Sequence, residues 1–225
     1  MSTHQHIFQN FLEELNKNNI NYYLLRGFEK LPNAPDSDID LVYDLNQHDD
    51  YIKIANKNLK HVKEFAATYP NGMVDLGFAE YTSMFLTPYM TGENDPTLPN
   101  GGFRVDSQNC LFFYSPLNNF TKHWTVPFEF NSYVLKTKRK VSNYFIPSAE
   151  CDVVLLTLRN VLDRQGNEKA KDWKEKHVNR IKNILPNCSK PELLQCFKMV
   201  LPDYEKITNY IYEEKYTNIF DELFK

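Results

Sequence analysis

The sequence predicts an α+β fold in which helices and strands are mixed over residues 1–147 and helices alone fill residues 148–225. Short apolar runs bounded by turn residues recur through the first part, as expected of strands. From Ser148 onward, apolar residues recur at helical spacing instead. We therefore expect an α/β core over residues 1–147, with a C-terminal helical bundle packed on it.

The first part begins with an amphipathic segment. Apolar residues at helical spacing predict a helix over about residues 5–17, with one face formed by Phe8, Phe11, Leu12 and Leu15. The apolar run Tyr22–Leu25 predicts a buried strand that ends at Gly27. Two prolines exclude regular structure from the loop Phe28–Pro35. A second strand is predicted over Ile39–Tyr43.

The remaining elements follow from the same patterns. A helix is predicted over residues 48–60, and an extended segment over Val62–Thr68. Further strands are predicted at Met73–Phe78, Ser83–Tyr89, Gly102–Asp106 and Cys110–Tyr114. The last two are expected to pair as a hairpin. Helices are predicted at Val153–Leu162, at Trp173–Leu185, after the capping box Ser189–Glu192, and twice between Asp203 and Phe224.

Composition limits the possible functions. A formal net charge of −3 with 24% charged residues argues against a nucleic-acid coat or a membrane-surface protein. Four cysteines without CxxC spacing, and no apolar stretch near 18 residues, predict a cytoplasmic protein with reduced thiols and no membrane span. The histidines show no ligand spacing, and no P-loop or Rossmann glycine pattern is present.

A cluster of acids stands at the head of the second strand, in Asp36-Ser37-Asp38-Ile39-Asp40. Side chains two residues apart on a strand point to the same face, so Asp38 and Asp40 project together while Ile39 packs into the core. Two such carboxylates repel each other unless a cation lies between them, and hard oxygen ligands suit Mg²⁺ or Mn²⁺. The alternative is an exposed acidic loop edge in which Asp36 and Asp38 cap a turn.

The segments Leu25–Phe28 and Asp36–Val42, with the loop between them, resemble the signature of the polymerase β-like nucleotidyltransferase superfamily. That signature is an apolar strand ending in Gly-Gly or Gly-Ser, a short linker, and Asp-x-Asp or Asp-x-Glu on the next strand. The Leu-Arg-Gly variant is similar to divergent, surface-glycan-associated members and to the related phosphocholine-transferase-like group. The resemblance covers roughly residues 20–44 and implies a small mixed sheet flanked by helices, two bound metals, and transfer of a nucleoside monophosphate to an acceptor hydroxyl.

The resemblance also implies a third acid on a neighbouring strand. We expect Asp106 to be that metal ligand and the base that accepts the acceptor's proton, with Asp75 as the alternative third ligand. A departure from the family pattern lies at Phe28, where the superfamily has glycine or serine. The catalytic and metal-binding residues expected from the resemblance are therefore Asp38, Asp40 and Asp106.

Other residues are expected to bind the donor phosphates. Gly27 and Ser37 are the first candidates. Arg26 either contributes to the same site or is a structural ion-pair partner. Arg159, within an apolar helix, either approaches the triphosphate or forms a salt bridge to Asp163 or Asp152.

The predicted function is a Mg²⁺-dependent (or Mn²⁺-dependent) nucleotidyltransferase, which moves a nucleoside monophosphate from a nucleoside triphosphate to a hydroxyl. The acceptor is expected to be a small molecule, a glycan or a protein rather than a long nucleic acid. One alternative is phosphocholine-transferase-like phosphoryl transfer to a sugar. The other is an inactive module of the same fold that serves in binding or as a toxin–antitoxin partner, for which Phe28 is the main support.

Overall fold

The structure is a computed structural model of the chain. It describes residues 3–28, 31, 38–59, 64–67, 83–86, 89–90, 103–108, 111–115, 122–162 and 173–223. The chain forms two compact units. The first unit is Met1–Thr68, Thr82–Leu111 and Leu135–Pro147, and the second is Tyr69–Tyr81, Phe112–Val134 and Ser148–Lys225. The second unit thus combines the C-terminal segment with residues 112–134, and the domain boundary after residue 147 stays a prediction.

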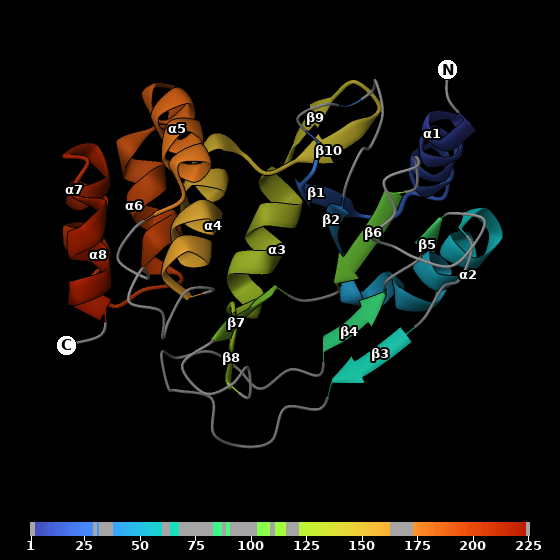
Figure 1. Cartoon of the computed structure of the whole chain (residues 1–225), viewed down its shortest axis with the longest axis horizontal. Coiled ribbons are helices and arrows are strands. Elements are labelled where there is room, and N and C mark those ends of the chain that lie inside the picture. The colour runs from blue at the N-terminus through green and yellow to red at the C-terminus, as the bar shows by residue number, and fades with distance from the viewer. Residues whose placement is uncertain are drawn as a thin grey trace. The chain divides into compact units, whose positions relative to one another are not determined.

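The described part of the first unit holds a six-stranded mixed sheet in the order β1-β2-β6-β4-β3, with β5 also paired to β6 (Figure 1). Its strands are β1 (Tyr22–Arg26), β2 (Asp38–Tyr43), β3 (Glu64–Ala67), β4 (Ser83–Leu86), β5 (Tyr89–Met90) and β6 (Phe103–Gln108). The β2 and β6 strands are parallel, and the other pairs are antiparallel. Strands far apart in the sequence therefore become neighbours at the centre of the sheet.

Two helices, α1 (Thr3–Lys17) and α2 (His48–Asn58), pack against one face of this sheet. The shared core contains the apolar stripe of α1 together with fully buried side chains of the strands, among them Ile39, Leu41 and Val105. Tyr51 of α2 stacks on Tyr43 with 3.9 Å between ring centroids, and its hydroxyl lies 2.5 Å from the hydroxyl oxygen of Ser107. Helix α2 thus contacts both β2 and β6.

A hairpin of β9 (Arg139–Val141) and β10 (Tyr144–Ile146) adds to the core of the first unit. Lys138, which precedes β9, donates a hydrogen bond to the amide oxygen of Asn21 and lies 4.7 Å from the centre of the Phe145 ring. Burial lowers the pKa of Lys138 to about 8, although attraction by Asp44 acts in the opposite direction. Lys138 therefore titrates closer to neutral pH than an ordinary lysine.

The second unit is mainly helical, with a hairpin of β7 (Phe112–Ser115) and β8 (Lys122–Thr125). Its helices are α4 (Ala149–Leu162), α5 (Glu175–Ile184), α6 (Lys190–Lys198), α7 (Tyr204–Tyr212) and α8 (Tyr216–Leu223). Helix α4 is buried along nearly its whole length, as its apolar sequence predicts. Its buried Asp152 pairs with Arg180 of α5, whose Nη2 lies 2.8 Å and 2.7 Å from the two carboxylate oxygens.

The predicted α+β class is confirmed, with a small mixed sheet flanked by helices and a C-terminal helical part. The helices expected near residues 5–17, 48–60, 153–162 and 173–185 are present. Ser189 also takes the N-cap position of α6, although its side chain makes no capping hydrogen bond. No described helix is long and apolar enough to cross a membrane.

Two details of the predicted strands and helices were wrong, namely a hairpin partner and one helix. The strand after Cys110 does not form a hairpin with β6, because β6 has β2 on one side and β4 and β5 on the other, while β7 pairs with β8. The predicted strand Ser83–Tyr89 contains β4 and the start of β5, which pair with β6 in one continuous antiparallel register, and residues 87–88 between them lie outside the described residues. Helix α3 (Phe128–Thr137) was not predicted. The predicted strand Met73–Phe78 lies outside the described residues.

Candidate active site

Three aspartates occupy one face of the central strands. Ile39, Leu41 and Val105 are fully buried in the core beneath α1 and α2. Because residues alternate between faces along a strand, Asp38 and Asp40 of β2 and Asp106 of β6 occupy positions on the opposite face. For Asp38 and Asp106 the structure describes the backbone alone.

The pairing of β2 with β6 brings two of these acids into register. Asp40 stands opposite Asp106, and Asp38 stands opposite Arg104. Neighbouring strands lie about 4.8 Å apart, so residues in register are as close as a sheet allows. Acids that are 66 residues apart in the sequence, Asp40 and Asp106, thus become direct neighbours.

A bulge in β1 places Arg26 in the same row. Leu24 pairs with Leu41, but the next pair is Arg26 with Asp40, so Leu25 is an extra residue without its own partner in β2. Without this shift, regular alternation would put Leu25 opposite Asp40 and turn Arg26 to the core face. The bulge therefore produces a row of three charged positions across three strands, Arg26, Asp40 and Asp106.

The Arg26 guanidinium binds the Asp40 carboxylate directly. Its Nη2 donates a hydrogen bond of 2.6 Å to Oδ1, and its Nε forms an ion pair with Oδ2. The Asp40 side chain is 6% exposed, whereas the Arg26 side chain is 33% exposed. Arg26 is thus an ion-pair partner of the motif itself, one of the two roles that the sequence left open. Its other role, phosphate binding, stays a prediction.

The turn after β1 departs from ordinary backbone geometry at Gly27, whose φ is 78°. This left-handed region favours glycine because a Cβ atom would clash there. Phe28 follows and packs against the core of the first unit, with its ring 6.5 Å from that of Tyr144. Its carbonyl accepts a hydrogen bond from the Leu31 amide. The side chain of Phe28 therefore anchors the start of the loop to the core of the first unit.

The donor set suits a hard divalent cation. Carboxylate oxygens are the ligands that Mg²⁺ and Mn²⁺ prefer, and two acids in register on adjacent strands repel each other unless a cation compensates. The Arg26 guanidinium already supplies one positive charge to Asp40. Among the side chains that the structure describes, no group of three or more His, Cys, Asp or Glu residues could hold a metal ion. Metal binding by Asp38, Asp40 and Asp106 therefore stays a prediction.

Three other predicted site residues lie outside the described residues or in the second unit. Ser37 and the alternative third ligand Asp75 lie outside the described residues. Arg159 lies in α4, in the second unit, and is partly buried. Asp152, one of the two salt-bridge partners considered for Arg159, is bound by Arg180. The phosphate-binding role of Arg159 stays a prediction.

Sequence reasoning missed two features of this face. The bulge at Leu25 has no sequence signal, because an apolar run looks the same with or without one extra residue. Arg104 stands opposite Asp38 in β6, and its position could be found only once the register of two distant strands was known. Two arginines and three aspartates thus share the face.

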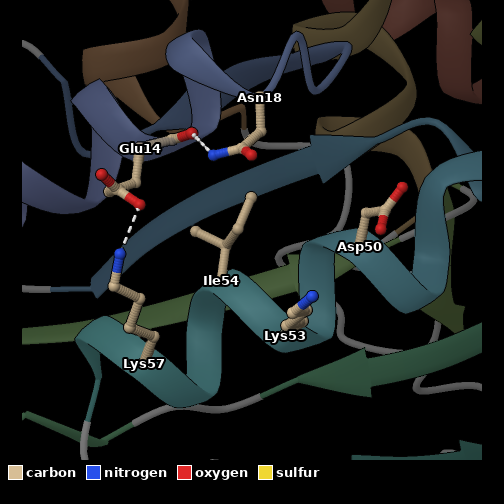
Figure 2. A pocket seen from close by; sticks show the side chains of 6 residues that line it. All are labelled: Glu14, Asn18, Asp50, Lys53, Ile54 and Lys57. Atoms are coloured by element: carbon tan, nitrogen blue, oxygen red, sulfur yellow. Dashed lines mark hydrogen bonds and ion pairs between the residues drawn. The ribbon is translucent and has the colours of Figure 1, made fainter.

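A shallow pocket of about 160 Å³ lies between α1 and α2 (Figure 2). Its lining side chains come from these two helices and from Asn18, directly after α1, and an ion pair of 2.8 Å between Glu14 and Lys57 crosses it. Because α1 and α2 cover the face of the sheet opposite Asp40, this pocket is not the candidate active site. None of the predicted site residues lines it.

No protein-family model matches the sequence, and no curated protein matches it at a significant level. Among solved structures, the chain is similar to the solution structure of the antibiotic-resistance factor ANT(2'')-Ia. That similarity has a TM-score of 0.41 and 8% sequence identity, and it covers 98% of this chain and 96% of that chain. At this level of similarity, functional inference depends on the residues of this chain.

Proposed function

We propose that this protein is a metal-dependent nucleotidyltransferase that moves a nucleoside monophosphate from a nucleoside triphosphate to a hydroxyl acceptor. The observation that carries the proposal is the row of Arg26, Asp40 and Asp106 in register across three strands. Asp38 lies two residues from Asp40 on the same face of β2. The Asp-Ile-Asp segment that forms this row is the part of the sequence that resembles the polymerase β-like superfamily.

Each residue of the row has a chemical role in this proposal. Asp38, Asp40 and Asp106 would hold a divalent cation, which neutralises charge on the donor phosphates and favours ionisation of the acceptor hydroxyl. Asp106 would also accept the proton of that hydroxyl. Gly27, with its positive φ, lets the chain turn beside Asp40 without a Cβ atom and leaves space for a phosphate.

The proposed acceptor is a small molecule, a glycan or a protein. The formal net charge of −3 gives no general attraction for a long polyanion. A phosphocholine-transferase-like reaction would use the same three acids with a different donor. The nature of the donor therefore separates these two enzymatic possibilities.

A non-catalytic binding module is a second candidate, and the Arg26–Asp40 ion pair favours it. An acid that is neutralised by a resident arginine needs no metal to be stable. Such a module would keep the fold but would gain no stability from nucleotide and Mg²⁺. Ligand-dependent stability therefore separates an enzyme from a module.

The test is a thermal-stability screen with Mg²⁺ and each of ATP, CTP, GTP, UTP and CDP-choline. A ligand at about 100 times its Kd stabilises the folded state by about 2.7 kcal/mol, which is about 5–11 °C for a chain of this size. We expect one nucleoside triphosphate to give this shift, and the Asp38→Asn, Asp40→Asn variant to lose it. The matched control replaces two neighbouring exposed acids of α2, Asp49→Ala and Asp50→Ala, and should keep the shift.

Two other results would change the assignment. A shift with CDP-choline alone would indicate the phosphocholine-transferase-like reaction. No shift with any of the five compounds, by folded wild-type protein, would refute the enzymatic proposal and favour the binding module.

A further inference from the structure

The bulge in β1 is the first observation that gives Arg26 a specific role. One extra residue, Leu25, turns Arg26 from the core face to the face that carries Asp40. Regular pairing would have placed an apolar side chain opposite the acid. A local backbone irregularity thus serves to bring one cation to one carboxylate of the candidate metal site.

The burial of the two partners is unequal, which is the second observation. The Asp40 side chain is 6% exposed, so removing the Arg26 guanidinium would take a directly bound cation from a buried carboxylate, which is unfavourable. The Arg26 side chain is 33% exposed, so a ligand from solvent has access to part of it, although its Nε atom is buried. The Asp152–Arg180 pair differs in this respect, because its arginine side chain is only 18% exposed.

The ion pair opposes the binding of either ligand alone. A divalent cation that binds Asp40 must compete with the guanidinium at both carboxylate oxygens. A phosphate that draws Arg26 away must leave Asp40 buried without this partner. A cation that arrives together with a phosphate satisfies both groups, because the cation replaces Arg26 at Asp40 and the phosphate accepts the released guanidinium.

We propose that Arg26 is a counter-ion of Asp40 that competes with metal. Its ion pair with Asp40 weakens the binding of free divalent cations, and its release to phosphate strengthens the binding of a cation–polyphosphate complex. This inference rests on the proposed function, because it assumes that Asp40 is a metal ligand. It assigns Arg26 to both roles that the sequence left as alternatives. In the ligand-free protein Arg26 is the counter-ion of Asp40, and in the loaded protein it binds the donor phosphates.

The test compares two affinities in four proteins: wild type, Arg26→Met, Arg26→Lys and Arg139→Met. Arg139 is an exposed arginine of the same unit, so its variant controls for the loss of one positive charge. Free Mn²⁺ affinity is measured by electron paramagnetic resonance of the unbound ion. Affinity for the equimolar Mn²⁺–tripolyphosphate complex is measured by titration calorimetry. Neither readout requires turnover or knowledge of the acceptor.

Competition by Arg26 predicts changes of opposite sign in the affinities for free Mn²⁺ and for the Mn²⁺–tripolyphosphate complex. Arg26→Met should bind free Mn²⁺ about 10-fold more tightly than the Arg139→Met control, and should bind the Mn²⁺–tripolyphosphate complex about 10-fold more weakly. Arg26→Lys should fall between wild type and Arg26→Met in both measurements, because lysine keeps the charge but not the two-nitrogen contact. Arg26→Lys also keeps the proposal testable if Arg26→Met does not fold. Adding Asp40→Asn should remove the gain in Mn²⁺ binding.

Three results would overturn this proposed role of Arg26. Free Mn²⁺ affinity that is the same in Arg26→Met and Arg139→Met would show that Arg26 does not compete with the cation, while the proposed function would stand. A gain in Mn²⁺ binding that survives Asp40→Asn would place the cation elsewhere. No Mn²⁺ binding by any of the four proteins, with or without tripolyphosphate, would refute this role of Arg26 and the proposed metal site together.

Discussion

Replacing Arg180 by methionine should destabilise the second unit by about 3–5 kcal/mol, because it removes a cation that binds the buried Asp152 carboxylate at close range. The Asp152 side chain is only 4% exposed, and Arg180 meets it through Nη2 at 2.7 and 2.8 Å and through Nε at 3.1 Å. Arginine and methionine have similar helix propensities, so α5 itself should be little affected. For a chain of this size the loss corresponds to about 6–20 °C in Tm.

Urea denaturation followed by tryptophan fluorescence measures this change in the relevant unit. Both tryptophans of the chain, Trp124 and Trp173, fall within the second unit, so their emission reports its unfolding. Guanidinium chloride is avoided because its ionic strength screens charges.

A matched control lies on the same helix. Lys182 of α5 pairs with Glu214 at 2.6 Å, but the two side chains are 43% and 55% exposed. Lys182→Met should therefore cost no more than about 1 kcal/mol. Adding Asp152→Asn to Arg180→Met should recover at least about 1 kcal/mol, because it removes the buried charge. A stabilising role of the buried pair is contradicted if Arg180→Met lowers the free energy of unfolding no more than Lys182→Met does, or if adding Asp152→Asn lowers it further.

Three further predictions concern the first unit. The pKa of Lys138 is about 8 in the folded protein against an ordinary 10.5, so between these values the unfolded state binds more protons and wild-type stability should rise with pH relative to Lys138→Met. Urea denaturation near pH 7.5 and pH 9.5 checks this, and a difference independent of pH contradicts it. Tyr51→Phe should lower the free energy of unfolding by about 1–3 kcal/mol, because it removes the hydroxyl that contacts buried Ser107. Ser107→Ala in that background should recover part of this loss. Strictly additive losses from the two substitutions would argue against the hydrogen bond. Gly27→Ala should cost about 1–2 kcal/mol in the same denaturation assay because φ is 78° there, and an unchanged unfolding midpoint would contradict this backbone conformation.

Local patterns predicted the elements that depend on neighbouring residues. Apolar spacing located α1 because Phe8, Phe11 and Leu15 all enter the core of the first unit. Strand alternation predicted that Ile39 would be buried, and it is fully buried in that core. The same alternation gave Asp38 and Asp40 a common face. Periodicity succeeds here because burial on one face of one element is the property that it measures.

Features that depend on distant pairing were not predictable in this way. Which strand lies beside β6 is decided by crossover connections, so a hairpin with the next apolar run was the natural but incorrect expectation. Helix α3 was missed because its aromatic and β-branched residues are typical of strands. Its buried Phe130, Asn131, Val134 and Leu135 nevertheless follow helical spacing and carry the missing signal.

Some features of the candidate site were likewise predictable from the sequence, and others were not. The motif around Asp38 and Asp40 was visible in the sequence, whereas the bulge that turns Arg26 toward Asp40 was not. Asp106 was chosen over Asp75 from the order of elements that the resemblance implies. The structure adds that Asp106 stands in register with Asp40, while its role as ligand and base stays a prediction.

Release of pyrophosphate distinguishes nucleotidyl transfer from nucleotide binding alone. The nucleoside triphosphate that stabilises the protein is incubated with Mg²⁺, a panel of sugars, small alcohols and proteins as hydroxyl acceptors, and either wild type or Asp106→Asn. Metal-dependent nucleotidyl transfer with Asp106 as the base predicts pyrophosphate release by wild type that stops on chelation of Mg²⁺, and release about 10²–10⁴-fold slower by Asp106→Asn. Equal release by Asp106→Asn, release that persists in a chelator, or no release from a nucleotide that binds would contradict it.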